Sequence, residues 1–135
     1  MDAQLIVLAR KCLEGSENNS MTFPQIIADL MTAGFESYWI DFRKATATYY
    51  LPNGQSVDLP THGSESPIAP ALDASALERA IGEAQRLVPG YTYKGFCVKA
   101  KAAGCAGYLV SFSGRRAVYF GRDGVVHTEL FPSAS

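Results

Sequence analysis

The stretch AGFESYWIDFRKATATYYLPNG (residues 33–54) is matched seventy residues later by AGCAGYLVSFSGRRAVYFGRDG (residues 103–124). Seven positions are identical without a gap, and conservative pairs such as Ile40/Val110 and Tyr50/Phe120 lie between them. Turn glycines, alternating aromatic residues and their spacing are preserved together. The match therefore predicts one folding unit written twice along the chain.

Each copy predicts two helices followed by three strands. Thr22 can cap a helix that has Pro24 in its first turn, and Gly34 can end that helix with a positive φ. Apolar residues at helical spacing predict helices over 2–13, 23–31, 73–87 and 93–100. Alternating patterns and turn residues predict strands over 37–42, 46–51, 55–59, 107–112, 115–121 and 125–131.

These elements predict an α+β fold in one domain, residues 1–135, with repeats at about 1–60 and 73–132 and a linker at 61–72. Two three-stranded sheets can join into one antiparallel sheet with helices on one side, or they can face each other. The single sheet is favoured, about a pseudo-two-fold axis. Its edge strands would invite pairing with a second chain, so we expect a homodimer or a protein partner.

The composition excludes several classes of protein. Hydrophobic residues make up 47% and charged residues 19% of the chain, which argues against disorder. The three cysteines are odd in number and form no CxxC pair, so no disulfide framework, metal site or cofactor is predicted. The apolar run 5–9 is too short for a membrane span and follows acidic Asp2 rather than a basic segment. We therefore expect a cytoplasmic protein without a membrane segment.

Charge divides unequally between the halves: residues 1–67 carry a net charge of −4 and residues 68–135 carry +3. Basic and aromatic residues alternate in the second half, which is one pattern of single-stranded nucleic-acid binding. The residues concerned are Lys94, Lys99, Lys101, Arg115, Arg116 and Arg122, with Tyr93, Tyr108, Tyr119 and Phe120 between them. The overall pI of about 6.1 argues against a nucleic-acid partner.

Polar side chains gather on the second hairpin. Tyr119 can lie beside His127 if the last two strands pair, and Glu129 shares a strand face with His127. Together with Arg116 they form a candidate site for anion binding or acid–base chemistry. The alternative is a surface ladder of polar cross-strand pairs. The Arg122–Asp123 turn is a further binding candidate.

Trp39 and Arg43 form a second candidate binding site. With Asp41 between them, they follow one another at every second residue on the outward face of the first strand, which permits a cation–π contact of Arg43 with Trp39. The alternative, which we favour, packs Trp39 under a helix. Cys97 and Cys105 have no histidine within four residues, which argues against thiol catalysis.

Two segments carry a family resemblance: Tyr38–Arg43 with Tyr49, Tyr50 and Gly54, and Gly114–Gly124 followed by His127, Glu129, Phe131 and Pro132. They resemble the YdfO/YbcV-like family of bacterial and prophage proteins, a domain of unknown function. The resemblance implies a duplicated α+β fold and no established activity or catalytic residues. The leading hypothesis is a prophage-type binding or regulatory protein without catalytic activity. The alternatives are an anion- or small-molecule-binding enzyme and a nucleic-acid-binding module.

Overall fold

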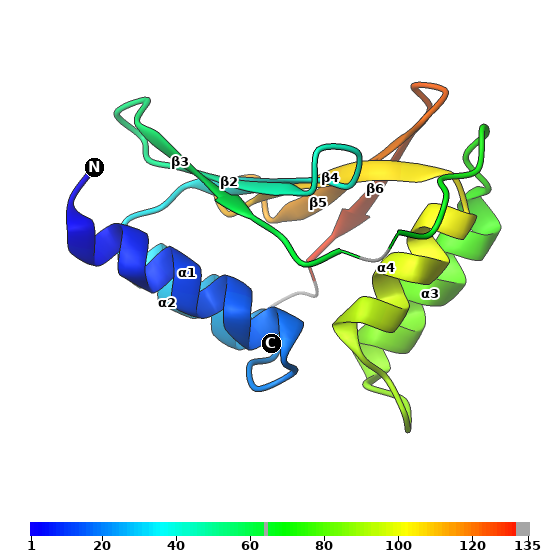
Figure 1. The fold of residues 1–135 in the computed structure, drawn as a ribbon, viewed down its shortest axis with the longest axis horizontal. Coiled ribbons are helices and arrows are strands. Elements are labelled where there is room, and N and C mark those ends of the chain that lie inside the picture. Colours follow the sequence, from blue (N-terminus) through cyan, green and yellow to red (C-terminus); the bar gives the residue numbers. More distant parts are fainter. Residues whose placement is uncertain (64, 132–135) are drawn as a thin grey trace.

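The computed structural model describes residues 1–63 and 65–131 (Figure 1). Residue 132, the end of the predicted second repeat, lies outside these described residues. The helices are α1 (Ala3–Glu17), α2 (Phe23–Thr32), α3 (Ala74–Arg86) and α4 (Tyr93–Ala102). The strands are β1 (Ser37–Asp41), β2 (Thr46–Tyr50), β3 (Ser56–Pro60), β4 (Cys105–Ser111), β5 (Arg116–Gly121) and β6 (Val126–Leu130).

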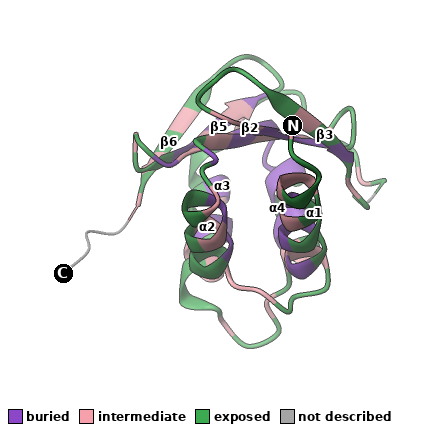
Figure 2. Ribbon diagram, turned by 90° about the vertical axis from the view of Figure 1, so that its left-hand side faces the viewer, coloured by how far each residue is buried: buried purple, intermediate pink, exposed green. Residues whose placement is uncertain are grey.

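All six strands form one antiparallel sheet in the order β3-β2-β1-β4-β5-β6. The helices lie together on one face of this sheet, α1 beside α2 and α3 beside α4 (Figure 1). Their buried surfaces are turned toward the sheet and toward each other (Figure 2). The α+β class and the single sheet are confirmed, and the alternative of two facing sheets is wrong.

Strand pairing follows the seventy-residue offset. At the centre of the sheet Trp39 pairs with Leu109, the residue at its own corresponding position. The β1–β2 pair Ser37↔Tyr50 recurs in β4–β5 as Gly107↔Phe120. The β2–β3 register recurs in the same way in β5–β6. Strand positions seventy residues apart therefore occupy corresponding places on the two sides of the β1–β4 pair.

The core lies between the sheet and the helices. Tyr38, Ile40 and Val110 point from the central strands into this layer, because alternate residues of a strand face opposite sides. Leu30 of α2 and Leu77 of α3 are fully buried against it. Burying large aliphatic side chains in this way contributes about 1.5–3 kcal/mol each, so the packed layer stabilises the sheet–helix arrangement.

Several element boundaries differ from the prediction, among them the end of α1 and the start of β4. α1 continues to Glu17, past the expected end at residue 13, and it contains Gly15, where a Cβ atom would lie 2.6 Å from the Met21 side chain. β4 begins at Cys105 rather than at 107, with an irregular register between Cys105 and Gly107. A glycine inside a helix and a strand irregularity both serve tertiary contacts, which local patterns do not display.

Thr22 caps α2 as predicted, with Gln25 completing a capping box: the Thr22 N–H donates to Gln25 Oε1 at 2.8 Å. We expect Thr22→Ala to lower the free energy of unfolding by about 1 kcal/mol, because orphaned N–H groups of the first turn lose their acceptor. Urea denaturation measures the change. Thr32→Ala, at the exposed end of the same helix, is the control and should change stability by less than about 0.5 kcal/mol. Equal losses in the two variants would contradict the capping role.

Candidate functional site

The face of the sheet opposite the helices has no described helix over it (Figures 1 and 2). We call it the open face. Tyr38 and Ile40 of β1 point toward the helices, so Trp39 between them points the other way. The open face carries Ser37, Trp39, Asp41, Thr46, Thr48, Tyr50, Leu109, Ser111, Arg116, Val118 and Phe120 of the four inner strands.

Three aromatic side chains and one leucine form a stripe that crosses the open face from β2 to β5. This aromatic stripe consists of Tyr50, Trp39, Leu109 and Phe120. The Trp39 and Phe120 rings meet edge to face with centroids 5.4 Å apart. Gly107 makes this approach possible, because a Cβ atom there would lie 2.9 Å from the Trp39 ring. The stripe borders a shallow hollow of about 460 Å³. The fold itself therefore leaves part of this aromatic surface exposed.

The expectation that Trp39 packs under a helix is wrong, because the strand alternation turns it to the open face. Its ring partner is Phe120, not the Arg43 guanidinium that the spacing suggested. The Asp41 carboxylate instead accepts the backbone N–H groups of Arg43 (2.9 Å) and Lys44 (3.1 Å) and closes the β1–β2 turn. Asp41 and the Arg43 backbone therefore shape the turn at the margin of the open face.

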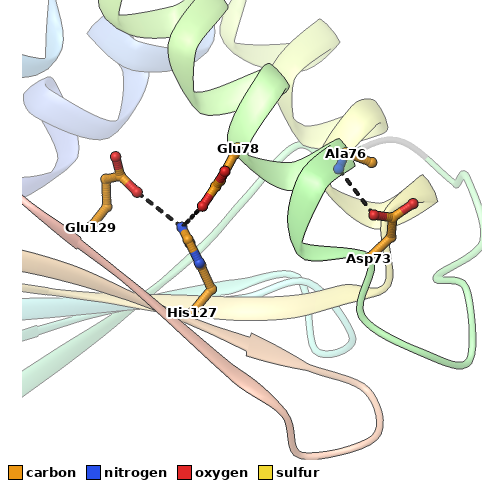
Figure 3. A network of polar contacts seen from close by, with 5 residues as sticks. All are labelled: Asp73, Ala76, Glu78, His127 and Glu129. Atoms are coloured by element: carbon orange, nitrogen blue, oxygen red, sulfur yellow. Dashed lines mark hydrogen bonds and ion pairs between the residues drawn. The ribbon is translucent and has the colours of Figure 1, made fainter.

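The predicted cluster on the second hairpin forms in part, on the helix side of the sheet (Figure 3). Tyr119 pairs with His127 across β5 and β6, with ring centroids 6.4 Å apart. His127 Nε2 lies 2.9 Å from Glu129 Oε2 and 3.8 Å from Glu78 Oε1, which comes from α3. Glu78 was missed because nothing in the sequence places this helix beneath β6.

Arg116 does not join this cluster. It alternates with Ala117 and Tyr119, so it lies on the open face, and its Nε donates to the Gly114 carbonyl at 3.0 Å. Two carboxylates therefore surround His127 without that arginine, which opposes binding of an anion. Burial also raises the pKa of Tyr119, so its phenol stays protonated at neutral pH. The cluster can tie β6 to α3 through a polar contact.

Arg122 and Asp123 fasten the linker between the two halves. Arg122 Nη1 donates to the Ile68 carbonyl at 2.9 Å, and the Leu72 N–H donates to Asp123 at 3.2 Å. The Asp123 carboxylate also accepts the Val125 N–H, and these bonds lower its pKa. Both candidate binding residues are thus engaged with the chain itself.

The aromatic residues of the nucleic-acid pattern are divided between the two faces of the sheet. Tyr108 and Tyr119 are buried beneath the sheet, whereas Phe120 lies on the open face. Lys101 is also buried, with its Nζ 5.7 Å from the Phe42 ring. Base stacking needs exposed rings beside exposed cations, so the burial of Tyr108, Tyr119 and Lys101 argues against the nucleic-acid alternative.

The three cysteines, Cys12, Cys97 and Cys105, are free and buried, as expected. Burial raises the pKa of Cys12 and Cys105 from 9.0 to about 11 and that of Cys97 to about 12. In residues 1–63 and 65–131, no group of three or more His, Cys, Asp or Glu side chains is suited to hold a metal ion. The thiols therefore act as small apolar core groups.

The raised thiol pKa values predict how stability depends on pH. Folding favours the protonated thiols, so this contribution is fully present below pH 9.0, the ordinary pKa of a cysteine thiol. It is lost as the pH rises through the folded values of about 11 and 12. Urea midpoints measured between pH 7 and the alkaline range should be level first and then decline above about pH 9. A midpoint that rises over the alkaline range would contradict the burial of the thiols.

A family model described as "Protein of unknown function (DUF1398)" matches residues 11–130. The chain belongs to the DUF1398 family. A search of the curated proteins found no match. Within its described residues, this DUF1398 chain has no helix with the length and apolar character needed to cross a membrane.

Proposed function

We propose that this DUF1398 chain is a binding or regulatory domain without catalytic activity, which contacts a protein partner through the open face of its sheet. The main observation behind this proposal is the aromatic stripe, which lies on a sheet face that no described helix covers. The proposal includes the prophage-type bacterial setting of the YdfO/YbcV-like proteins and a cytoplasmic location. It also includes an origin by internal duplication, which the matching strand registers support.

The composition of the open face supports a protein partner. Aromatic residues dominate the energetic centres of protein interfaces, where large rigid side chains bury much area at a small entropic cost. Trp39 and Phe120 occupy the middle of the face, and polar Ser37, Asp41 and Ser111 flank them. An apolar centre with a polar margin is the usual anatomy of such an interface.

The His127 cluster supports the same proposal rather than the enzyme alternative. The His127 side chain is only 15% exposed, and its Nε2 lies 2.9 Å from Glu129 Oε2. Arg116, the residue that would have attracted an anion, lies across the sheet. We infer that the cluster positions β6 and that recognition takes place on the opposite face.

Trp39→Ala should weaken capture of the partner from a host lysate by at least about tenfold while leaving the fold intact, because a central aromatic anchor contributes about 2 kcal/mol or more. Quantitative pull-down with purified variants measures this, and circular dichroism checks the fold. Met31→Ala, an exposed apolar side chain on α2, is the matched control and should leave capture unchanged.

His127→Ala separates the proposal from the enzyme alternative and should also leave capture unchanged. Equal capture by the Trp39 and Met31 variants would remove the open face as the binding surface. Loss of capture in the His127 variant alone would move the site to the helix side of the sheet.

A further inference from the structure

The two edge strands of the sheet differ in how they present their backbone. In β6, the Val125 carbonyl and the Phe131 N–H bond to β5, so the intervening even-numbered residues direct their N–H and C=O groups outward. These residues are Val126, Thr128 and Leu130, which have exposed side chains on the open face. Within residues 1–63 and 65–131, the β6 edge therefore offers three unpaired donors and three unpaired acceptors to a further strand.

The β3 edge occupies the corresponding place but is protected. Gln55 and Thr61 bond to β2, so Ser56, Asp58 and Pro60 face outward. Proline has no N–H to donate, and a charged residue opposes strand addition, two features with which natural sheets prevent pairing at their edges. At the same three positions, seventy residues later, β6 has valine, threonine and leucine, which favour strand pairing.

We propose that β6 pairs antiparallel with β6 of a second copy of this chain, about a two-fold axis at Thr128, to form a continuous twelve-stranded sheet. In this register Val126 of each copy lies opposite Leu130 of the other, and the two threonines lie opposite each other. The three pairs form six backbone hydrogen bonds. The inference goes beyond the proposed function, because it uses the sheet edge rather than the aromatic stripe.

Charge on the helix side favours the same register. With Thr128 at the axis, His127 of one copy lies opposite Glu129 of the other, so no two carboxylates face each other across the axis. A register centred on residue 129 would place two glutamates opposite each other, and one centred on 127 would reduce the edge to two residue pairs. Figure 2 shows β6 at the outer margin of the sheet, on the side of α2 and α3.

Cysteine cross-linking tests the geometry with a matched pair of variants. Cα atoms of directly opposed residues lie about 5.5 Å apart, within disulfide range. Thr128→Cys should therefore give a disulfide-linked dimer rapidly under mild oxidation, whereas Asp58→Cys, at the corresponding place on β3, should stay monomeric over the same time. The native thiols are buried and do not compete. Equal rates in the two variants, or faster linking through β3, would overturn the proposal.

Solution mass supplies a second test without a cross-link. The native chain should show twice its chain mass of 14.6 kDa by light scattering at high micromolar concentration. Thr128→Asp opposes two carboxylates at the axis and should raise the dissociation constant by at least about tenfold. Thr128→Val should keep the dimer. A native chain that is monomeric throughout, or a dimer that persists in the aspartate variant, would overturn the proposal.

If the aspartate variant unfolds, Leu130→Pro tests dimerisation instead. The Leu130→Pro variant should fold, because the fold already accepts proline at the corresponding position, Pro60. This variant should be a folded monomer, and a persistent dimer would again overturn the proposal. Failure of dimerisation is distinguishable from failure of the proposed function, since Trp39→Ala should reduce partner capture without changing the mass.

Discussion

Gly104→Ala should destabilise the protein by about 3 kcal/mol or more, a far larger loss than Gly34→Ala seventy residues earlier in the chain. Both glycines follow a helix and have a positive φ, +91° at Gly104 and +101° at Gly34. A Cβ atom at Gly104 would lie 2.1 Å from the Ala71 carbonyl oxygen, whereas one at Gly34 would have nothing within 4 Å. Only Gly104 therefore adds a backbone collision to the conformational cost.

The chain around Gly104 has little freedom to move away. The Asp73 N–H donates to the Ala103 carbonyl at 2.7 Å, and the Arg122 N–H donates to the Gly104 carbonyl at 2.9 Å. Gly34→Ala is the matched control and should cost about 1 kcal/mol, the usual penalty for a non-glycine residue at positive φ. Urea denaturation of both variants compares them directly. Similar losses of stability in the two variants would show that the Ala71 carbonyl does not restrict the space at Gly104.

Leu77→Ala should lower the free energy of unfolding by about 2–5 kcal/mol. Leu77 of α3 is fully buried, so truncation removes apolar contacts and leaves a cavity between the helices and the sheet. Val7 of α1 lies at the corresponding position of the first half but is 62% exposed. Val7→Ala should therefore change stability by less than about 0.5 kcal/mol.

Denaturant midpoints of these two variants test whether the halves pack alike. A large loss in the Val7 variant would mean that an unseen contact covers α1. A small loss in the Leu77 variant would contradict the burial of α3. Either outcome would alter how the two helix pairs are placed against the sheet.

Much of the secondary structure was predictable because its signals are local. Thr22 as a helix cap, Gly34 and Gly104 as helix ends and the alternating Tyr38/Ile40 pattern each depend on residues a few positions apart. The pairing of Tyr119 with His127 was also predictable, since the short Arg122–Gly124 turn fixes the register of the last hairpin.

The candidate site was less predictable, because its neighbours are distant in the sequence. Trp39 of β1 meets Phe120 of β5 over the intervening strand β4. Glu78 meets His127 only because α3 lies beneath β6. Arg122 and Asp123 are likewise committed to a linker fifty residues away. No local pattern contains these contacts.

The sequence by itself determined the helices, the strands and the seventy-residue correspondence, because hydrophobic period, caps and turns act over neighbouring residues. Only the tertiary structure decided which face of the sheet stays open, where Trp39 points and which residues surround His127. Those outcomes depend on how helices and strands pack at long sequence separation, where the side-chain pattern permits several arrangements and the shared core selects one.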